Sequence, residues 1–268
     1  MNLFHREYGS GYPIVILHGL YGSSDNWMSI ADKLSDSYRV ILPDQRNHGR
    51  SLHSQLHTYE AMSKDLYELV ERLGVKKFIL VGHSMGGKTA SFFAKKWPGM
   101  LSGLVVIDIK PFAYSPGQGG AGEMHRAILQ KMADTDPALI KDRDEAHRIF
   151  NDIVSSKKVR NFLLKNLHRN KSGEFEWRLN PGNLLSNLDN IFDGLELPAR
   201  SDHKDIISGF PASFLRAMNS DYISNDDYED IQALFPAAEI MEIPDSSHWV
   251  HAEKPELIPS MIRENFPA

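Results

Sequence analysis

The stretch FILVGHSMGGK, from Phe78 to Lys88, decides the fold and points to a chemistry. Its first four residues are apolar and predict a buried strand, and the residues from Gly86 onward predict a helix. The turn between them, Gly82-His83-Ser84-Met85-Gly86, follows the pattern G-x-S-x-G. Such a sharp turn leaves no room for a Cβ atom at the two flanking positions. We therefore expect a strained Ser84 with its hydroxyl above the sheet, as the candidate nucleophile.

Short apolar runs like this one recur along the chain, with helical patterns between them. Thr58 to Leu73 has apolar residues at helical spacing, with Thr58 as a candidate N-cap, and Pro255 to Phe266 predicts a last helix. Strands that alternate with helices are typical of an α/β fold, a mostly parallel sheet with helices on both faces. The predicted strands are Ile14–Leu17, Arg39–Leu42, Phe78–Val81, Leu104–Ile109, Ser213–Met218 and Glu239–Ile243.

The alternation breaks between Phe112 and Gly209. This block opens with a Gly-rich stretch from Ser115 to Gly122 and continues with three or four helical patterns, without a convincing strand. We therefore predict a core formed by residues 1–112 and 209–268, and an inserted helical cap, or lid, formed by residues 113–208.

Composition excludes several classes of function. The chain has 268 residues, 41% of them hydrophobic and 24% charged, which is ordinary for a folded globular protein. Its net charge of -5 argues against nucleic acid or an anionic membrane as a partner. The absence of cysteine excludes disulfides, thiolate metal sites and a cysteine nucleophile. The first residues match neither a signal peptide nor a membrane span, so we expect a cytoplasmic location.

A serine hydroxyl needs a positioned base to act as a nucleophile. Among 12 histidines, His248 follows the predicted strand Glu239–Ile243 by five residues and precedes the last helix. That order predicts a loop at the carboxyl edge of the sheet, at the same end as Ser84. His248 is therefore the candidate base. His18 and His48 fall in other loops at this edge.

Two backbone N–H groups are expected to stabilise the oxyanion that such a reaction forms. One belongs to Met85, the residue after the candidate nucleophile. The segment His18-Gly19-Leu20-Tyr21-Gly22 follows an early strand, so the Leu20 amide is the second candidate and the Tyr21 amide the alternative.

Together these motifs resemble a known family, the α/β-hydrolases of the serine-esterase type. Within it, they are similar to the branch of abhydrolase-domain-containing protein eleven and its small bacterial acyl esterase relatives. The resemblance implies ester or thioester hydrolysis by a serine, histidine and acid triad, without metal or other cofactor. Ser247 departs from the pattern, because many relatives have glycine before the histidine. Four segments carry the resemblance to this family: HGLYGSSDNW at His18–Trp27, DQRNHGRS at Asp44–Ser51, GHSMGGK at Gly82–Lys88 and SSHWVHAEKP at Ser246–Pro255.

The acid of the triad is ambiguous in the sequence. The usual position in the family, counted from the start of the strand near Pro211, falls on Ser220, with Asp221 one residue later. The resembling branch instead uses the end of the strand Leu104–Ile109, where this chain has Asp108. A carboxylate there can reach the imidazole Nδ1, so we favour Asp108, with Ser220 as a supporting hydroxyl. The remaining alternatives are Asp221, Asp226 and Asp245.

The predicted substrate is a small-molecule acyl ester or thioester with a short- to medium-chain acyl group, cleaved through an acyl-serine intermediate. From Ser155 to Gly173 the chain has six basic residues and no acid. This basic stretch can attract the phosphates of a coenzyme A thioester, or it can be the solvated face of an amphipathic helix. Alternatives are a carbon–carbon bond hydrolase or cofactor-free synthase of the same fold, or a non-catalytic binding protein.

Overall fold

A seven-stranded sheet forms the centre of the computed structural model, which describes residues 1–114, 121–197 and 206–266. The strand order is β1-β3-β2-β4-β5-β8-β9, and all neighbours are parallel except β1 and β3. The predicted α/β architecture and all six predicted strands are confirmed. The strands are β1 His5–Tyr8, β2 Tyr12–Leu17, β3 Tyr38–Pro43, β4 Phe78–His83, β5 Leu101–Ile107, β8 Ala212–Ala217 and β9 Ala238–Ile243.

Strand β1 is the member of this sheet that the sequence did not reveal. Its four residues, HREY, are half-buried or exposed and pair with β3 alone, at the edge of the sheet. Short, charged strands are typical of sheet edges, and they lack the apolar run by which buried strands are recognised.

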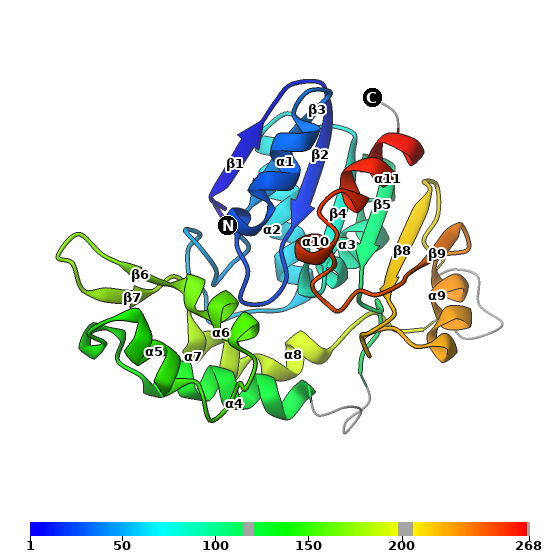
Figure 1. Ribbon diagram of the computed structural model, residues 1–268. Coiled ribbons are helices and arrows are strands. Elements are labelled where there is room, and N and C mark those ends of the chain that lie inside the picture. Colours follow the sequence, from blue (N-terminus) through cyan, green and yellow to red (C-terminus); the bar gives the residue numbers. More distant parts are fainter. Residues whose placement is uncertain (115–120, 198–205, 267–268) are drawn as a thin grey trace.

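Helices cover both faces of the sheet (Figure 1). On one face α1 and α11 pack against the strands, and on the other face α2, α3 and α9 do so. Thr58 caps α2 as predicted, because its side chain accepts a hydrogen bond from the Ala61 amide. These helices are α1 Met28–Leu34, α2 Tyr59–Arg72, α3 Met85–Lys96, α9 Tyr228–Leu234 and α11 Leu257–Asn265, with the short α10 at Val250–Glu253.

The block between β5 and β8 lies beside the carboxyl edge of the sheet (Figure 1). Its buried side chains, among them Leu129, Phe150 and Leu184, form one apolar cluster that also includes Leu20 and Met85 of the core. Residues 115–120, most of the predicted Gly-rich loop, lie outside the described residues. The helices of this block are α4 Ala121–Asp134, α5 Arg143–Ile149, α6 Lys157–Leu163, α7 Pro181–Ser186 and α8 Leu188–Phe192.

The same block contains a two-stranded antiparallel sheet, β6 Leu167–Arg169 and β7 Phe175–Trp177. The expectation that it holds no strand was therefore wrong. Each strand is only three residues long, which is too short for an alternating pattern to stand out from a helical one. The described residues also include short 3-10 helices: η1 Ser24–Trp27, η2 Pro98–Met100, η3 Pro137–Leu139, η4 Leu164–Asn166 and η6 Asn225–Asp227. Within the described ranges, no helix combines the length and the apolar character needed to cross a bilayer.

The register of the sheet brings the ends of five strands to one edge. Leu17 of β2 pairs with Gly82 of β4, and His83 of β4 pairs with Ile107 of β5. Ile107 in turn pairs with Leu215 of β8, and Ala217 of β8 pairs with Ile243 of β9. Because the strands are parallel, the loops that follow them emerge together at this carboxyl edge. Every residue singled out as a candidate for the site follows one of these strands.

Candidate active site

Ser84 occupies the tight turn between β4 and α3. Its backbone has φ 53° and ψ -124°, a conformation that a residue with a side chain rarely adopts. A Cβ on Gly82 would lie 2.3 Å from the Gly86 carbonyl oxygen, and one on Gly86 would lie 2.5 Å from the Leu17 carbonyl oxygen. Both glycines are therefore required by close backbone contact. The half-buried Ser84 lines a cavity at the carboxyl edge of the sheet.

His248 and Asp108 meet beside this turn. His248 lies in the loop between β9 and α10, and its Nδ1 is 2.8 Å from Oδ2 of Asp108, which directly follows β5. Asp108 is completely buried, and its carboxylate also accepts hydrogen bonds from the Ala217 amide at 3.0 Å and the Ser220 hydroxyl at 2.5 Å. A carboxylate accepts only, so His248 Nδ1 carries the proton and Nε2 remains the basic nitrogen.

Of the acids considered from the sequence, Asp108 is the one whose carboxylate is bonded to His248. Ser220 is bonded to the same oxygen of Asp108, as the supporting role requires. The other three acids considered from the sequence have exposed side chains: Asp221, Asp226 and Asp245.

Aromatic and imidazole rings surround His248. The Tyr222 ring stacks on the His248 ring, with the ring centroids 4.0 Å apart, and the centroid of the His83 ring lies 4.7 Å from that of His248. His83 Nε2 also contacts the His248 carbonyl oxygen at 2.8 Å, so its N–H donates to that oxygen. Burial holds the pKa of His83 well below its ordinary value and lowers the pKa of His251 to about 4. Both are therefore neutral neighbours of His248 at pH 7. Sequence reasoning assigned no role to Tyr222, which no motif marks, or to His251, which lies within the segment Ser246–Pro255.

The loop after β2 lies directly against the turn of Ser84. A Cβ on Gly19 would come within 3.1 Å of the Ser84 Cβ, and Leu20 and Met85 line the same cavity as Ser84. The Tyr21 amide donates to His48 Nε2 at 3.3 Å. Because that bond occupies the Tyr21 amide, the geometry favours Leu20 over Tyr21 as the candidate oxyanion donor.

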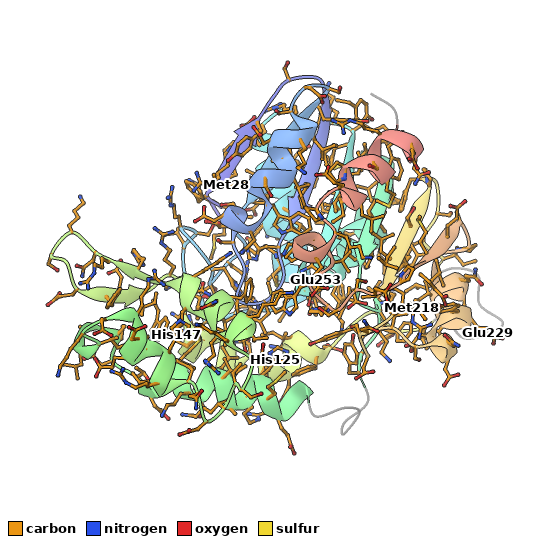
Figure 2. All side chains as sticks on the ribbon, in the orientation of Figure 1. Met28, His125, His147, Met218, Glu229 and Glu253 are labelled. Carbon is orange, nitrogen blue, oxygen red and sulfur yellow. The ribbon has the colours of Figure 1, made fainter. Side chains whose placement is uncertain are left out.

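The cavity has a volume of about 290 Å³ and lies between the sheet edge and the block of α4 to α8. Its lining is mostly apolar, with Ile128, Val159 and Phe162 on the side of the block. The imidazole of His125, labelled in Figure 2, contacts the hydroxyl groups of Tyr21 at 3.1 Å and Tyr222 at 3.2 Å. Burial lowers the pKa of His125 to about 4, so this polar chain carries no charge at pH 7.

In the part of the chain that the structure describes, no group of three or more His, Asp or Glu side chains is placed to hold a metal ion. The chemistry available at this edge is that of a buried carboxylate, an oriented imidazole, a strained serine and backbone amides.

Comparison with known proteins identifies the family. Residues 12–255 match the family described as alpha/beta hydrolase fold. The chain belongs to the α/β-hydrolases. It is 40% identical to the sn-1-specific diacylglycerol lipase ABHD11 of Danio rerio, over 95% of this chain and 78% of that protein. It is 33% identical to Esterase YbfF of Escherichia coli, over 94% of this chain and 91% of that protein.

A solved structure titled "Marine microorganism esterase" superimposes on this α/β-hydrolase with a TM-score of 0.90 at 38% identity, covering 98% of this chain and 99% of that one. Lipases and esterases thus stand among its similar relatives, and it groups with the carboxylesterase-type hydrolases of the family.

Replacing Gly82 with alanine should destabilise the fold of this hydrolase, because the new methyl group must displace the Gly86 backbone. We expect Gly82→Ala to lower the free energy of unfolding by about 2 kcal/mol, measured by urea denaturation. Gly99→Ala is the matched control, since a Cβ at Gly99 meets no atom within 4 Å. An equal change in both variants would contradict the packing argument.

Proposed function

We propose that this protein is a serine hydrolase that cleaves carboxylic esters or thioesters of short- to medium-chain acyl groups through an acyl-serine intermediate. The observation that carries the proposal is the 2.8 Å bond between His248 Nδ1 and the buried Asp108, beside a strained Ser84 in one cavity. This combination orients one basic nitrogen and one hydroxyl, which is what acyl transfer requires.

In the proposed reaction Ser84 Oγ attacks the acyl carbonyl carbon while His248 Nε2 takes the hydroxyl proton. Asp108 stays ionised and stabilises the imidazolium, and its bonds to Ala217 and Ser220 keep it in place. The tetrahedral oxyanion receives hydrogen bonds from backbone amides of Leu20 and Met85. His248 then donates its proton to the leaving alcohol or thiol, and a water molecule hydrolyses the acyl-serine by the same steps.

The cavity supports an apolar substrate of modest size. About 290 Å³ is at the small end of ligand pockets, which suits a short- to medium-chain acyl group. The neutral state of His83, His125 and His251 suits an uncharged ester, because the cavity wall then offers no charge to pair. One similar relative is named a diacylglycerol lipase, so diacylglycerol belongs among the substrates to test.

Hydrolysis of p-nitrophenyl esters from acetyl to palmitoyl, together with a diacylglycerol emulsion, tests the proposal. We expect initial rates to peak at a short or medium chain, since longer acyl groups exceed the cavity, and to vanish in Ser84→Ala. Ser84-dependent cleavage of carbon–carbon bonds without ester turnover would instead indicate a carbon–carbon hydrolase. Absence of any turnover would leave a binding protein, or a synthase with another substrate.

The acid assignment is tested by comparing Asp108→Asn with Asp221→Asn. We expect Asp108→Asn to lower kcat by about 10,000-fold, because an amide can no longer fix the His248 tautomer or stabilise its cation. Asp221→Asn, on an exposed side chain, should stay within about twofold of the wild type. Circular dichroism checks that both variants fold. A large loss in Asp221→Asn with little loss in Asp108→Asn would refute the assignment.

We further propose that coenzyme A thioesters are among the substrates, on the basis of the basic stretch around α6. Ser155 and Ser156 line the cavity, and the exposed Lys157 follows them directly at the start of α6. Lys158 serves a different purpose, since its ammonium pairs with Glu253 at 2.6 Å. Lys157 is thus an exposed cation that directly follows two residues of the cavity wall, and it is our candidate contact for a phosphate group of the substrate.

Lys157→Glu should raise KM for a medium-chain acyl-coenzyme A several-fold at low salt, by about threefold or more, because the variant repels the phosphates. KM for an uncharged p-nitrophenyl ester should not change. Lys171→Glu, at the turn between β6 and β7, makes the same charge change as a control. Equal effects on the thioester and the ester, or in both variants, would reject this preference.

A further inference from the structure

The segment Asp44 to Ser51 has a motif-like sequence that the proposed reaction does not use. Its His48 is completely buried, and so is His18 at the start of the loop after β2. The two rings lie 5.2 Å apart, and each makes one hydrogen bond to the segment from Gly19 to Tyr21. These bonds bear on the backbone that supplies the Leu20 amide.

His18 fixes the peptide between Gly19 and Leu20. Its Nδ1 lies 2.9 Å from the Gly19 carbonyl oxygen, which also accepts from the Gly22 amide at 3.0 Å. Its Nε2 accepts from the Gln45 amide at 2.9 Å. A carbonyl only accepts and an amide only donates, so His18 is a neutral ring with its proton on Nδ1. In a trans peptide the N–H points away from the C=O, so holding the Gly19 oxygen also sets the direction of the Leu20 N–H.

His48 fixes the next peptide, between Leu20 and Tyr21. It does so as an acceptor through Nε2, whereas His18 acts as a donor through Nδ1. Its Nδ1 donates to the Arg46 carbonyl oxygen at 2.9 Å, and its Nε2 accepts from the Tyr21 amide at 3.3 Å. Tyr21 has φ 62°, a strained backbone that needs such a partner to persist. Burial lowers the pKa of both histidines, which keeps both rings in the neutral state that these bonds require.

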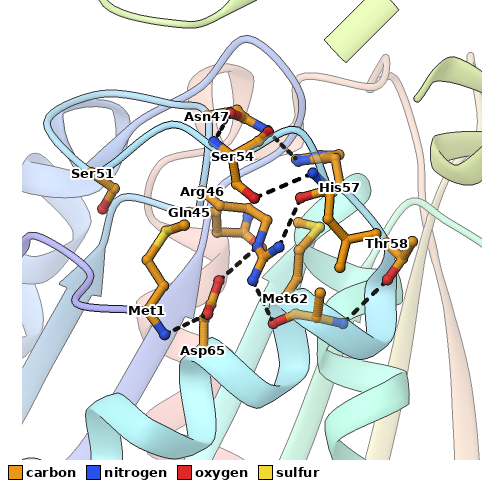
Figure 3. Close-up of polar contacts among 12 residues, drawn as sticks. Met1, Gln45, Arg46, Asn47, Ser51, Ser54, His57, Thr58, Met62 and Asp65 are labelled. Carbon is orange, nitrogen blue, oxygen red and sulfur yellow. Dashed lines mark hydrogen bonds and ion pairs between the residues drawn. The ribbon is translucent and has the colours of Figure 1, made fainter. Parts of the chain in front are cut away.

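Polar contacts anchor the segment that presents His48, and those of Arg46 with Asp65 are drawn in Figure 3. Arg46 Nε pairs with the buried Asp65 of α2 at 2.7 Å, and the same guanidinium donates to the carbonyl oxygens of Leu56 and Ala61. Asp44 accepts from the amides of Ser24 and Arg50. The charged residues of this segment therefore anchor it on α2 and η1, so that His48 stays in place.

We propose that His18 and His48 are positioning residues that preorganise the oxyanion hole of the proposed hydrolase. They act through the backbone: His18 Nδ1 fixes the Gly19 carbonyl and His48 Nε2 engages the Tyr21 amide, which directs the Leu20 amide at the developing oxyanion. The inference rests on the proposed function. A donor aimed in advance stabilises the transition state without reorganisation, so its loss lowers kcat more than it changes KM.

Because His18 bonds this segment through Nδ1 and His48 bonds it through Nε2, Asn and Gln substitutions should have opposite effects at the two positions. An asparagine amide takes the place of Nδ1, whereas a glutamine amide reaches the place of Nε2. His48→Gln keeps the acceptor for the Tyr21 amide and His18→Asn keeps the donor to the Gly19 carbonyl, so both should retain kcat within about threefold. His48→Asn and His18→Gln lose those bonds, and their kcat should fall by about tenfold or more at unchanged KM.

The second readout is inhibition by an alkyl trifluoromethyl ketone, which adds to the serine and places an oxyanion in the hole. Its Ki should rise in His48→Asn and His18→Gln in proportion to the loss of kcat. His57→Asn is the matched control. His57 is a buried histidine whose ring centroid lies 5.9 Å from that of His48, and it bonds Asn47 rather than the Gly19–Tyr21 segment. It should leave kcat and Ki within about twofold of the wild type.

Equal losses in the asparagine and glutamine variants, or losses no larger than in His57→Asn, would overturn the inference while leaving the proposed function intact. An unchanged Ki in the impaired variants would overturn it as well. Circular dichroism checks that each variant folds. If one of the two variants at a histidine does not fold, the Asn and Gln variants at the other histidine still test the inference, because the expected preference between Asn and Gln is reversed there. A wild-type protein without Ser84-dependent ester turnover would refute the proposed function, and this inference with it.

Discussion

The close contact of backbone with backbone at the turn between β4 and α3 is the constraint on which the rest of the structure depends. A Cβ on Gly82 would collide with the Gly86 backbone, and a Cβ on Gly86 would collide with the backbone at the end of β2, so neither position tolerates a side chain. This packing forces Ser84 into a positive φ. It also fixes how the helix α3 leaves the sheet, so the fold and the candidate nucleophile share one physical cause.

A second constraint is the burial of the Asp108 carboxylate. A charge in a dry site is costly unless hydrogen bonds compensate for the lost water. Three donors do so here, Ala217 at the end of β8, Ser220 in the loop after β8 and His248 in the loop after β9. The same bonds that make the charge tolerable also orient the imidazole, so the electrostatic need and the chemical role coincide.

The histidines around the site follow a related logic. His18, His48, His83, His125 and His251 all have pKa values that burial lowers, and the first four act as neutral hydrogen-bonding groups. Neutral rings can orient backbone groups without adding charge to an apolar cavity. His248 differs from them, because it is partly exposed and its Nδ1 is bonded to a carboxylate.

The sequence by itself determined the parallel sheet, its six apolar strands, the turn at Ser84 and the candidate base His248. These features are encoded locally, in apolar runs and in glycines at fixed spacing, so a single chain reveals them. It did not determine the polar edge strand β1 or the short strands β6 and β7, whose patterns are too brief to distinguish.

Only the tertiary structure favours Asp108 over Asp221, as the carboxylate bonded to His248, and Leu20 over Tyr21, as the candidate oxyanion donor. Those choices depend on which loops meet at the carboxyl edge, and hence on strand order and register rather than on neighbouring residues. The same holds for Tyr222 on His248, His125 between two tyrosines, and His48 on the Tyr21 amide. Each contact joins segments that are far apart in the chain. Which groups become hydrogen-bond or stacking partners therefore depends on how the folded chain brings them together, and the sequence does not state that.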